Sequence, residues 1–136
     1  MSGVKQMFLN LPVKDLRISI DFFTKIGFSF DQTFTNEHGT CMIIGENIYA
    51  MLLTEEFYST FITKSIADAR QSSELITALA VGSRHEVDKL VDSAVAAGAT
   101  GDKIEDHGWM YGRYFEDPDG HIWQIFYMDM SAIPKE

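Results

Sequence analysis

The sequence lacks several features that mark common protein classes. It contains one cysteine, Cys41, so a single chain can form neither an internal disulfide nor a cluster of several thiolates around a metal. No apolar run reaches the roughly 18 residues that a membrane helix needs. Residues 1–4 lack the basic-then-apolar pattern of a secretory signal. We therefore expect a cytoplasmic protein that does not insert into a membrane.

Basic residues are also scarce. The chain has 11 Lys and Arg against 20 Asp and Glu, which gives a net charge of −9. Because such a chain repels phosphate backbones and anionic lipid surfaces, we expect neither nucleic acid nor a membrane as a partner. Hydrophobic residues make up 46% and charged residues 23% of the 136 residues. These values are typical of one globular domain or of two very small repeats.

Two segments have the pattern of an amphipathic helix. The first starts at Asp15, a good N-cap, and ends at Gly27. The second runs from Ser83 to Gly98, and Ser83 and Glu86 form the pattern of a capping box. Apolar residues recur at helical spacing in both segments, namely Leu16, Ile20, Phe23 and Ile26 in the first and Val87, Leu90, Val91, Ala94 and Val95 in the second.

Short β-type runs surround both helices, with a strong turn signal at residues 117–120. The runs cover residues 8–13, 28–35, 40–44 and 48–54, then 75–81, a weak run near Ile104, 110–116 and 121–128. The order of one strand, one helix and three strands occurs twice. The caps Asp15 and Ser83 lie 68 residues apart (83 − 15), half of the 136-residue chain. We predict two modules that share a core, residues 1–54 and 75–136, joined by a helical segment at 55–74.

Two sequence motifs accompany this duplication. The first is Leu11-Pro-Val-Lys-Asp-Leu16 leading into Phe22-Phe23 and Gly27-Phe28, and the second is Asp117-Pro-Asp-Gly-His-Ile-Trp-Gln-Ile-Phe126. Together they resemble the vicinal oxygen chelate superfamily of glyoxalases, bleomycin-resistance proteins and extradiol dioxygenases. Ser83-Arg84 with Glu86-Val87-Asp88, and His107-Gly-Trp-Met-Tyr-Gly112, further resemble its predicted glyoxalase-like, or lactoylglutathione-lyase-like, branch.

The resemblance implies an α+β fold. Two βαβββ modules would form one eight-stranded, curved and incompletely closed sheet around a cup, with the helices outside. It also implies four metal-ligand positions, and here these fall on Phe8, Leu52 (or Ala50, if the alignment is one pleat off), Ile76 and Gln124. A divalent cation needs several imidazole or carboxylate ligands, which these side chains do not supply. We therefore expect no metal and no other cofactor.

The resemblance places eight side chains in the cup: Phe8, Asn10, Ala50, Leu52, Ile76, Ala78, Gln124 and Phe126. Apolar walls with two orienting amides are typical of a small-molecule site, although the same side chains could simply fill the cup as core. His107 and Trp109 lie in an aromatic stretch beside Glu105 and Asp106 that could reach over the mouth of the cup. For His107, a ligand contact and a plain surface position both stay open.

We interpret the chain as a glyoxalase- and bleomycin-resistance-like protein that binds a small, mostly apolar or aromatic molecule in a metal-free cup. Residues 55–74 offer aromatic surface for an interface, and members of the resembled family typically dimerise. Both points favour a homodimer. One alternative is an enzyme, either a metal-dependent lyase, isomerase or dioxygenase with displaced ligands or a metal-free catalyst. The other is a non-catalytic dimeric scaffold with a filled cup. The sequence indicates no catalytic residue.

Overall fold

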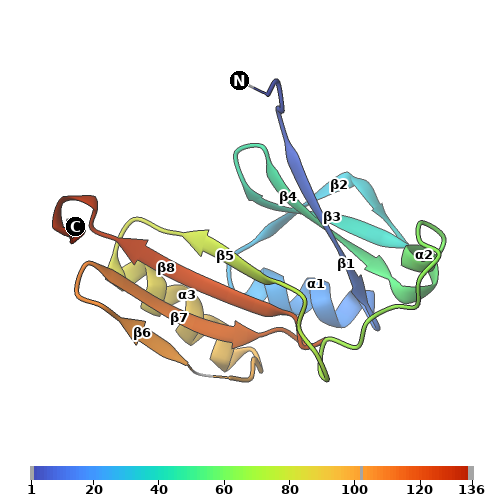
Figure 1. Cartoon of the computed structure of the whole chain (residues 1–136). Coiled ribbons are helices and arrows are strands. Elements are labelled where there is room, and N and C mark those ends of the chain that lie inside the picture. Colours follow the sequence, from blue (N-terminus) through green and yellow to red (C-terminus); the bar gives the residue numbers. More distant parts are fainter. Residues whose placement is uncertain (1, 102, 135–136) are drawn as a thin grey trace. The chain divides into compact units, whose positions relative to one another are not determined.

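The computed structural model describes residues 2–101 and 103–134 (Figure 1). The chain divides into two compact units, Met1–Ala67 and Asp68–Glu136. The outermost residues of the two predicted modules, 1 and 135–136, lie outside the described residues. Within the described part, no helix is long and apolar enough to cross a membrane.

The first unit consists of a strand, a helix and three strands, followed by a short helix. These elements are β1 (Met7–Val13), α1 (Leu16–Lys25), β2 (Ser29–Asn36), β3 (Gly39–Gly45), β4 (Ile48–Thr54) and α2 (Glu55–Ser59). The strands form one sheet in the order β1-β4-β3-β2, in which β1 runs parallel to β4 and the other pairs are antiparallel. Helix α1 packs against β4 (Figure 1).

The second unit repeats this order. Its elements are β5 (Ile76–Ala80), α3 (Arg84–Ala96), β6 (Ile104–Asp106), β7 (Met110–Glu116), β8 (Ile122–Met128) and a single 3-10 turn, η1 (Met130–Ala132). The sheet order is β5-β8-β7-β6, and α3 packs against β7 and β8. Both predicted βαβββ modules and the α+β class are thus confirmed, as two four-stranded sheets. The union of these sheets into one eight-stranded sheet stays a prediction.

The predicted caps begin both long helices. The Asp15 side chain accepts a hydrogen bond from the Ile18 amide at 3.1 Å, and the Ser83 hydroxyl accepts one from the Glu86 amide at 3.1 Å. The predicted apolar stripe of α3 is wrong at one position, because Val95 is 46% exposed. The connecting segment is helical only over Glu55–Ser59, so most of residues 55–74 lie outside the predicted helix.

Each sheet has one face that packs on the helix of its own unit, here called the helix face, and an opposite face, here called the open face. Met42, Ala50 and Leu52 are fully buried on the helix face of the first sheet. Trp123 and Ile125 are fully buried on that of the second. The Trp123 indole donates to the buried Asp117 carboxylate at 3.0 Å, so the turn that precedes β8 is attached to the core.

The predicted cup position of Leu52 is wrong. In the parallel pairing of β1 with β4, Phe8 lies opposite Tyr49 and Leu11 lies opposite Leu52. Paired residues point to the same face of a sheet, so Leu52 shares the helix face with Leu11 and cannot share the open face with Phe8. Ala50, two residues before Leu52, lies on the helix face too. Met51, opposite Asn10, is the β4 residue that occupies the open face.

This register predicts unequal effects of two neighbouring substitutions. Leu52→Ala should lower the free energy of unfolding by about 2–5 kcal/mol, because it leaves a cavity in a packed core. Met51→Ala should cost less than half as much, since Met51 is only half-buried on the open face. Urea unfolding of both variants measures the difference. If Met51→Ala were the costlier change, the faces of β4 would be reversed.

Candidate ligand-binding face

The open face of the second sheet gathers three of the predicted site residues. In the register of the strands, Gln124 of β8 lies between Ala78 of β5 and Tyr114 of β7. Ile76 and Phe126 point to the same face, because they stand two positions from Ala78 and Gln124. Ile76 is 51% exposed, whereas Gln124 and Phe126 are half-buried. The strands therefore place one amide among apolar side chains.

The centre of this face is a glycine. A Cβ atom added to Gly112 would lie 3.1 Å from Gln124 Nε2, 3.2 Å from Phe126 Cβ and 3.3 Å from Met110 Cε. These three side chains therefore converge over Gly112, and the backbone of β7 lies directly beneath them. The missing side chain is what lets the Gln124 amide lie close to the strand.

A hydrogen-bonded pair adds charge beside Gln124. The Tyr114 hydroxyl donates to Glu105 Oε1, and a ring nitrogen of His107 lies 3.3 Å from Glu105 Oε2. Lys103 Nζ lies 3.9 Å from the same carboxylate and 5.3 Å from the centre of the Tyr114 ring. The carboxylate of β6 is thus shared by a phenol, an imidazole and an ammonium group.

These contacts move the pKa values of Glu105 and Tyr114 further away from neutral pH. The hydrogen bond from Tyr114, with a smaller contribution from His107, lowers the pKa of Glu105 below its ordinary value. The same bond raises the pKa of Tyr114 to about 12. At neutral pH the open face carries an ionised carboxylate that accepts a hydrogen bond from a neutral phenol.

His107 and Trp109 lie together in the turn between β6 and β7. Their rings stack with centroids 6.3 Å apart, and the imidazole contacts Glu105. The His107 side chain is 56% exposed and Trp109 is half-buried. His107 is thus joined to the open face through the Glu105 carboxylate, and Trp109 through its stacking on the His107 ring.

Phe8 and Asn10 belong to the open face of the first unit. The Phe8 ring stacks on Tyr49 with centroids 4.8 Å apart, and the Asn10 amide donates to the Phe8 carbonyl at 3.3 Å. Both residues are exposed. Leu52 is not part of this face, so the predicted residues of the first unit reduce to these two.

The residues at the family's ligand positions do not fit a metal ion. Phe8 and Ile76 carry no donor atom, and Gln124 offers only a neutral amide. Across residues 2–101 and 103–134, no three His, Cys, Asp or Glu side chains gather closely enough to hold a metal. The arrangement can orient a polar ligand group, and the Glu105–His107 pair can exchange a proton with it.

Sequence reasoning missed Glu105, Gly112 and Tyr114 as site residues. The turn at residues 117–120 could have revealed Tyr114, since a hairpin closed there places Glu116 opposite Ile122 and hence Tyr114 opposite Gln124. The same alternation puts Gly112 on that face. Glu105 had no such signal, because β6 is only three residues long.

Comparisons with known proteins bear on the fold. A family model described as the Glyoxalase/Bleomycin resistance protein/Dioxygenase superfamily matches residues 5–125. The comparison with curated proteins found no match. Among solved structures, hypothetical protein SA1046 from S. aureus superposes with a TM-score of 0.77 at 24% identity, covering 93% of this chain and 95% of that one.

Two further structures have descriptions that name an activity. A lactoylglutathione lyase from Agrobacterium tumefaciens has a TM-score of 0.69 at 14% identity, with 98% of each chain covered. TnmS3, an antibiotic binding protein from Streptomyces sp. CB03234, has a TM-score of 0.65 at 18% identity and covers 94% of this chain and 98% of that one. At these identities, the likenesses show the fold alone.

The Glu105–Tyr114 bond predicts the titration of Tyr114. In Glu105→Gln, the Tyr114 pKa should fall from about 12 toward its ordinary 10.0, because no carboxylate then favours the protonated phenol. Since the raised pKa stabilises the fold fully below the unfolded value, the wild type should lose this stability between pH 10 and about 12. The variant should start less stable and change less over that range.

NMR of the Tyr114 ring carbons measures the pKa, and chemical denaturation measures the stability. Glu116→Gln is the matched control, because Glu116 lies on the same strand as Tyr114 and does not bond to its hydroxyl. A wild-type Tyr114 that titrates near 10.0 would contradict the bond.

Proposed function

Because the chain belongs to the glyoxalase/bleomycin resistance protein/dioxygenase superfamily, we propose that it binds a small, mostly apolar or aromatic molecule without a metal ion. One observation carries the proposal: Gln124 stands on the open face of the second sheet, among apolar side chains and opposite Tyr114. Apolar walls with a few orienting polar groups are what a small-molecule site requires.

The polar groups restrict the kind of ligand. A molecule placed over Gly112 would touch Phe126 and Met110 and could both donate to and accept from the Gln124 amide. The ionised Glu105 beside this position disfavours an anionic ligand. We therefore propose an uncharged or weakly basic aromatic molecule that carries at least one hydrogen-bonding group.

The donor chemistry supports binding without a metal. The resemblance places the family's metal ligands at positions that here carry Phe8, Leu52 (or Ala50), Ile76 and Gln124, and a hard cation would find no carboxylate or imidazole there. An antibiotic binding protein shares this fold, so binding of a small molecule such as an antibiotic is compatible with it.

A metal-free enzyme is a second candidate. The observation that favours it is the contact of 3.3 Å between His107 and Glu105, since an imidazole held by a carboxylate can take and return a proton. A lactoylglutathione lyase also shares the fold. Binding comes first in either case, so the following experiment tests the step that both candidates share.

The binding proposal predicts the effect of one substitution. Nile red, an uncharged aromatic dye, should fluoresce on the protein and be displaced by uncharged aromatic antibiotics. Gln124→Leu should weaken binding of those displacing compounds that carry a hydrogen-bonding group by about 1–2 kcal/mol, the cost of a lost hydrogen bond. It should leave stability unchanged or higher, because a half-buried amide is replaced by an apolar side chain of similar size.

Gln32→Leu, which changes an exposed glutamine of β2, is the matched control and should bind like the wild type. A chelator should change nothing in either protein. Equal affinities of Gln124→Leu and the wild type would contradict the site, and binding that requires added Zn²⁺ would favour the metal-dependent alternative.

We also propose a homodimer. Phe61 is 66% exposed beside Phe57, whose ring lies 5.0 Å from it, so the connecting segment presents aromatic surface. Light scattering at micromolar concentration should give about twice the chain mass of 15.4 kDa, and Phe61→Glu should shift the protein toward monomer because it places a charge in an apolar contact. Phe34→Glu, at a side chain 61% exposed on β2, is the control. A wild-type mass of one chain would refute the dimer.

A further inference from the structure

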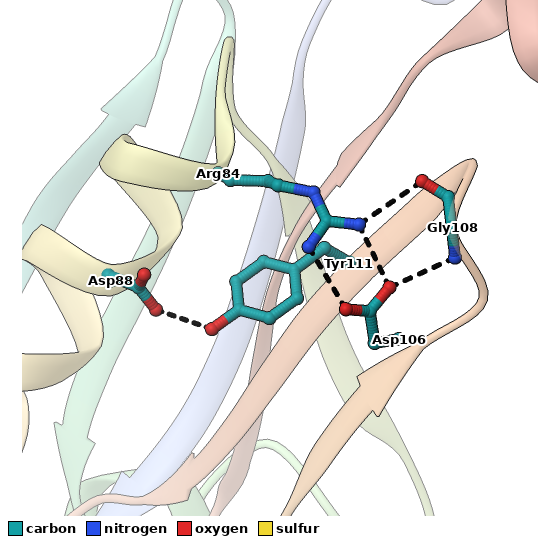
Figure 2. Close-up of polar contacts among 5 residues, drawn as sticks. All are labelled: Arg84, Asp88, Asp106, Gly108 and Tyr111. Atoms are coloured by element: carbon teal, nitrogen blue, oxygen red, sulfur yellow. Dashed lines mark hydrogen bonds and ion pairs between the residues drawn. The ribbon is translucent and has the colours of Figure 1, made fainter.

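The proposed function uses His107 and Gly112 but does not explain why the motif that contains them lies against a second motif. Ser83–Asp88 opens α3, and His107–Gly112 forms the turn before β7 and the start of that strand. The structure brings them together on the helix face of the second unit (Figure 2). Arg84 Nη1 donates to Asp106 Oδ2 at 3.0 Å and Arg84 Nη2 donates to Asp106 Oδ1 at 2.8 Å, which is a bidentate pair.

The same guanidinium reaches the turn itself. Arg84 Nη2 also donates to the Gly108 carbonyl at 3.1 Å, and the Gly108 amide donates to Asp106 Oδ1 at 2.9 Å. Gly108 has a φ of +82°, a left-handed conformation that favours glycine. One arginine and one carboxylate therefore satisfy both backbone groups of the residue at the tip of the turn (Figure 2).

The guanidinium is itself held in place. It lies 4.8 Å from the centre of the Tyr111 ring, and the Tyr111 hydroxyl donates to Asp88 at 2.5 Å, one helical turn after Arg84 (Figure 2). The hydrogen bond from Arg84, with that from the Gly108 amide second, lowers the pKa of Asp106 to about 2. The Arg84–Asp106 pair thus stays ionised throughout the neutral range.

The other side of the turn carries the candidate ligand contacts. His107 lies between Asp106 and Gly108, and its ring meets Glu105 and the Trp109 ring. The His107 amide donates to the Met110 carbonyl at 2.8 Å, and the Asp129 amide donates to the Trp109 carbonyl at 2.7 Å. Arg84 and Asp106 therefore add contacts at Gly108 to a turn whose backbone is also held on both sides of His107, while the His107 ring itself contacts Glu105 and Trp109.

We propose that Arg84 is a positioning residue, which holds the turn 106–109 so that His107 and Trp109 stand at the edge of the open face. The reason for this placement, a ligand contact by His107 and Trp109, rests on the proposed function. An ion pair with side chains 44% and 47% exposed contributes little to global stability. Its effect is therefore expected in the local geometry of the turn rather than in the stability of the unit.

NMR tests this directly and needs no ligand. Arg84→Met keeps the length of the side chain and removes the guanidinium, and Asp106→Asn removes the shared carboxylate. Both should speed exchange of the Gly108 amide by about tenfold or more, as expected when a turn opens locally. Both should also abolish the nuclear Overhauser effect between the His107 and Trp109 rings. The effect of the double variant should be smaller than the sum of the two single effects, because Arg84 and Asp106 bond to each other as well as to Gly108.

Lys25→Met is the matched control, since it removes an exposed ion pair with Asp21 from the first unit. It should change neither readout. Unchanged Gly108 exchange and ring contact in Arg84→Met would overturn the inference. Faster exchange of all amides of the second unit to the same degree would also overturn it, because Arg84 would then be a general stability residue.

Nile red provides the functional arm. If the turn contributes to binding, Arg84→Met and His107→Ala should each weaken dye binding about five- to tenfold, the scale of one lost contact. Unchanged dye binding in Arg84→Met together with weakened binding in His107→Ala would overturn the positioning role. A wild-type protein that binds no dye would count against the proposed function, while the exchange and ring-contact measurements would still decide the role of Arg84.

Discussion

The four-stranded sheet of the second unit packs α3 on one face, and this one-sided cover decides where other residues can go. Side chains alternate between the faces of a strand, so the positions of β8 that meet α3 must be apolar. Trp123 and Ile125 fill them and are fully buried. Gln124 and Phe126 alternate with them and point away from α3. The polar groups of the candidate site thus occupy positions that do not pack against α3.

How well the sequence predicts a face depends on whether the strand alternates in polarity. In β8 the polar Gln124 stands between two large apolar residues, and this pattern together with the family resemblance indicated its face. In β4 the run from Tyr49 to Leu53 is apolar throughout, so its polarity does not indicate which side chains lie on which face of the sheet. The face of Leu52 is fixed by parallel pairing with β1, about 40 residues earlier in the chain, and no local pattern encodes that register. The helix starts were predictable because Asp15 and Ser83 act on amides three residues away.

The contacts that form the candidate site also differ in how far the local sequence predicts them. The register of β7 against β8 is set by a tight turn, and the sequence contains all that is needed to place Tyr114 opposite Gln124. The partners of Glu105 depend on β6, whose three residues offer neither length nor alternation. Arg84 and Asp106 lie 22 residues apart on different kinds of element, so only the packing of α3 on the sheet joins them.

Gly112 links two properties that are usually separate in a binding site. Since the Gln124 amide, Phe126 and Met110 converge over it, any side chain there would push against all three at once. A single substitution of Gly112 would then change both the depth of the open face above β7 and the direction of the Gln124 amide. Evolution toward a smaller ligand at this position would therefore also redirect the amide, so ligand size and ligand polarity are expected to diverge together among related chains.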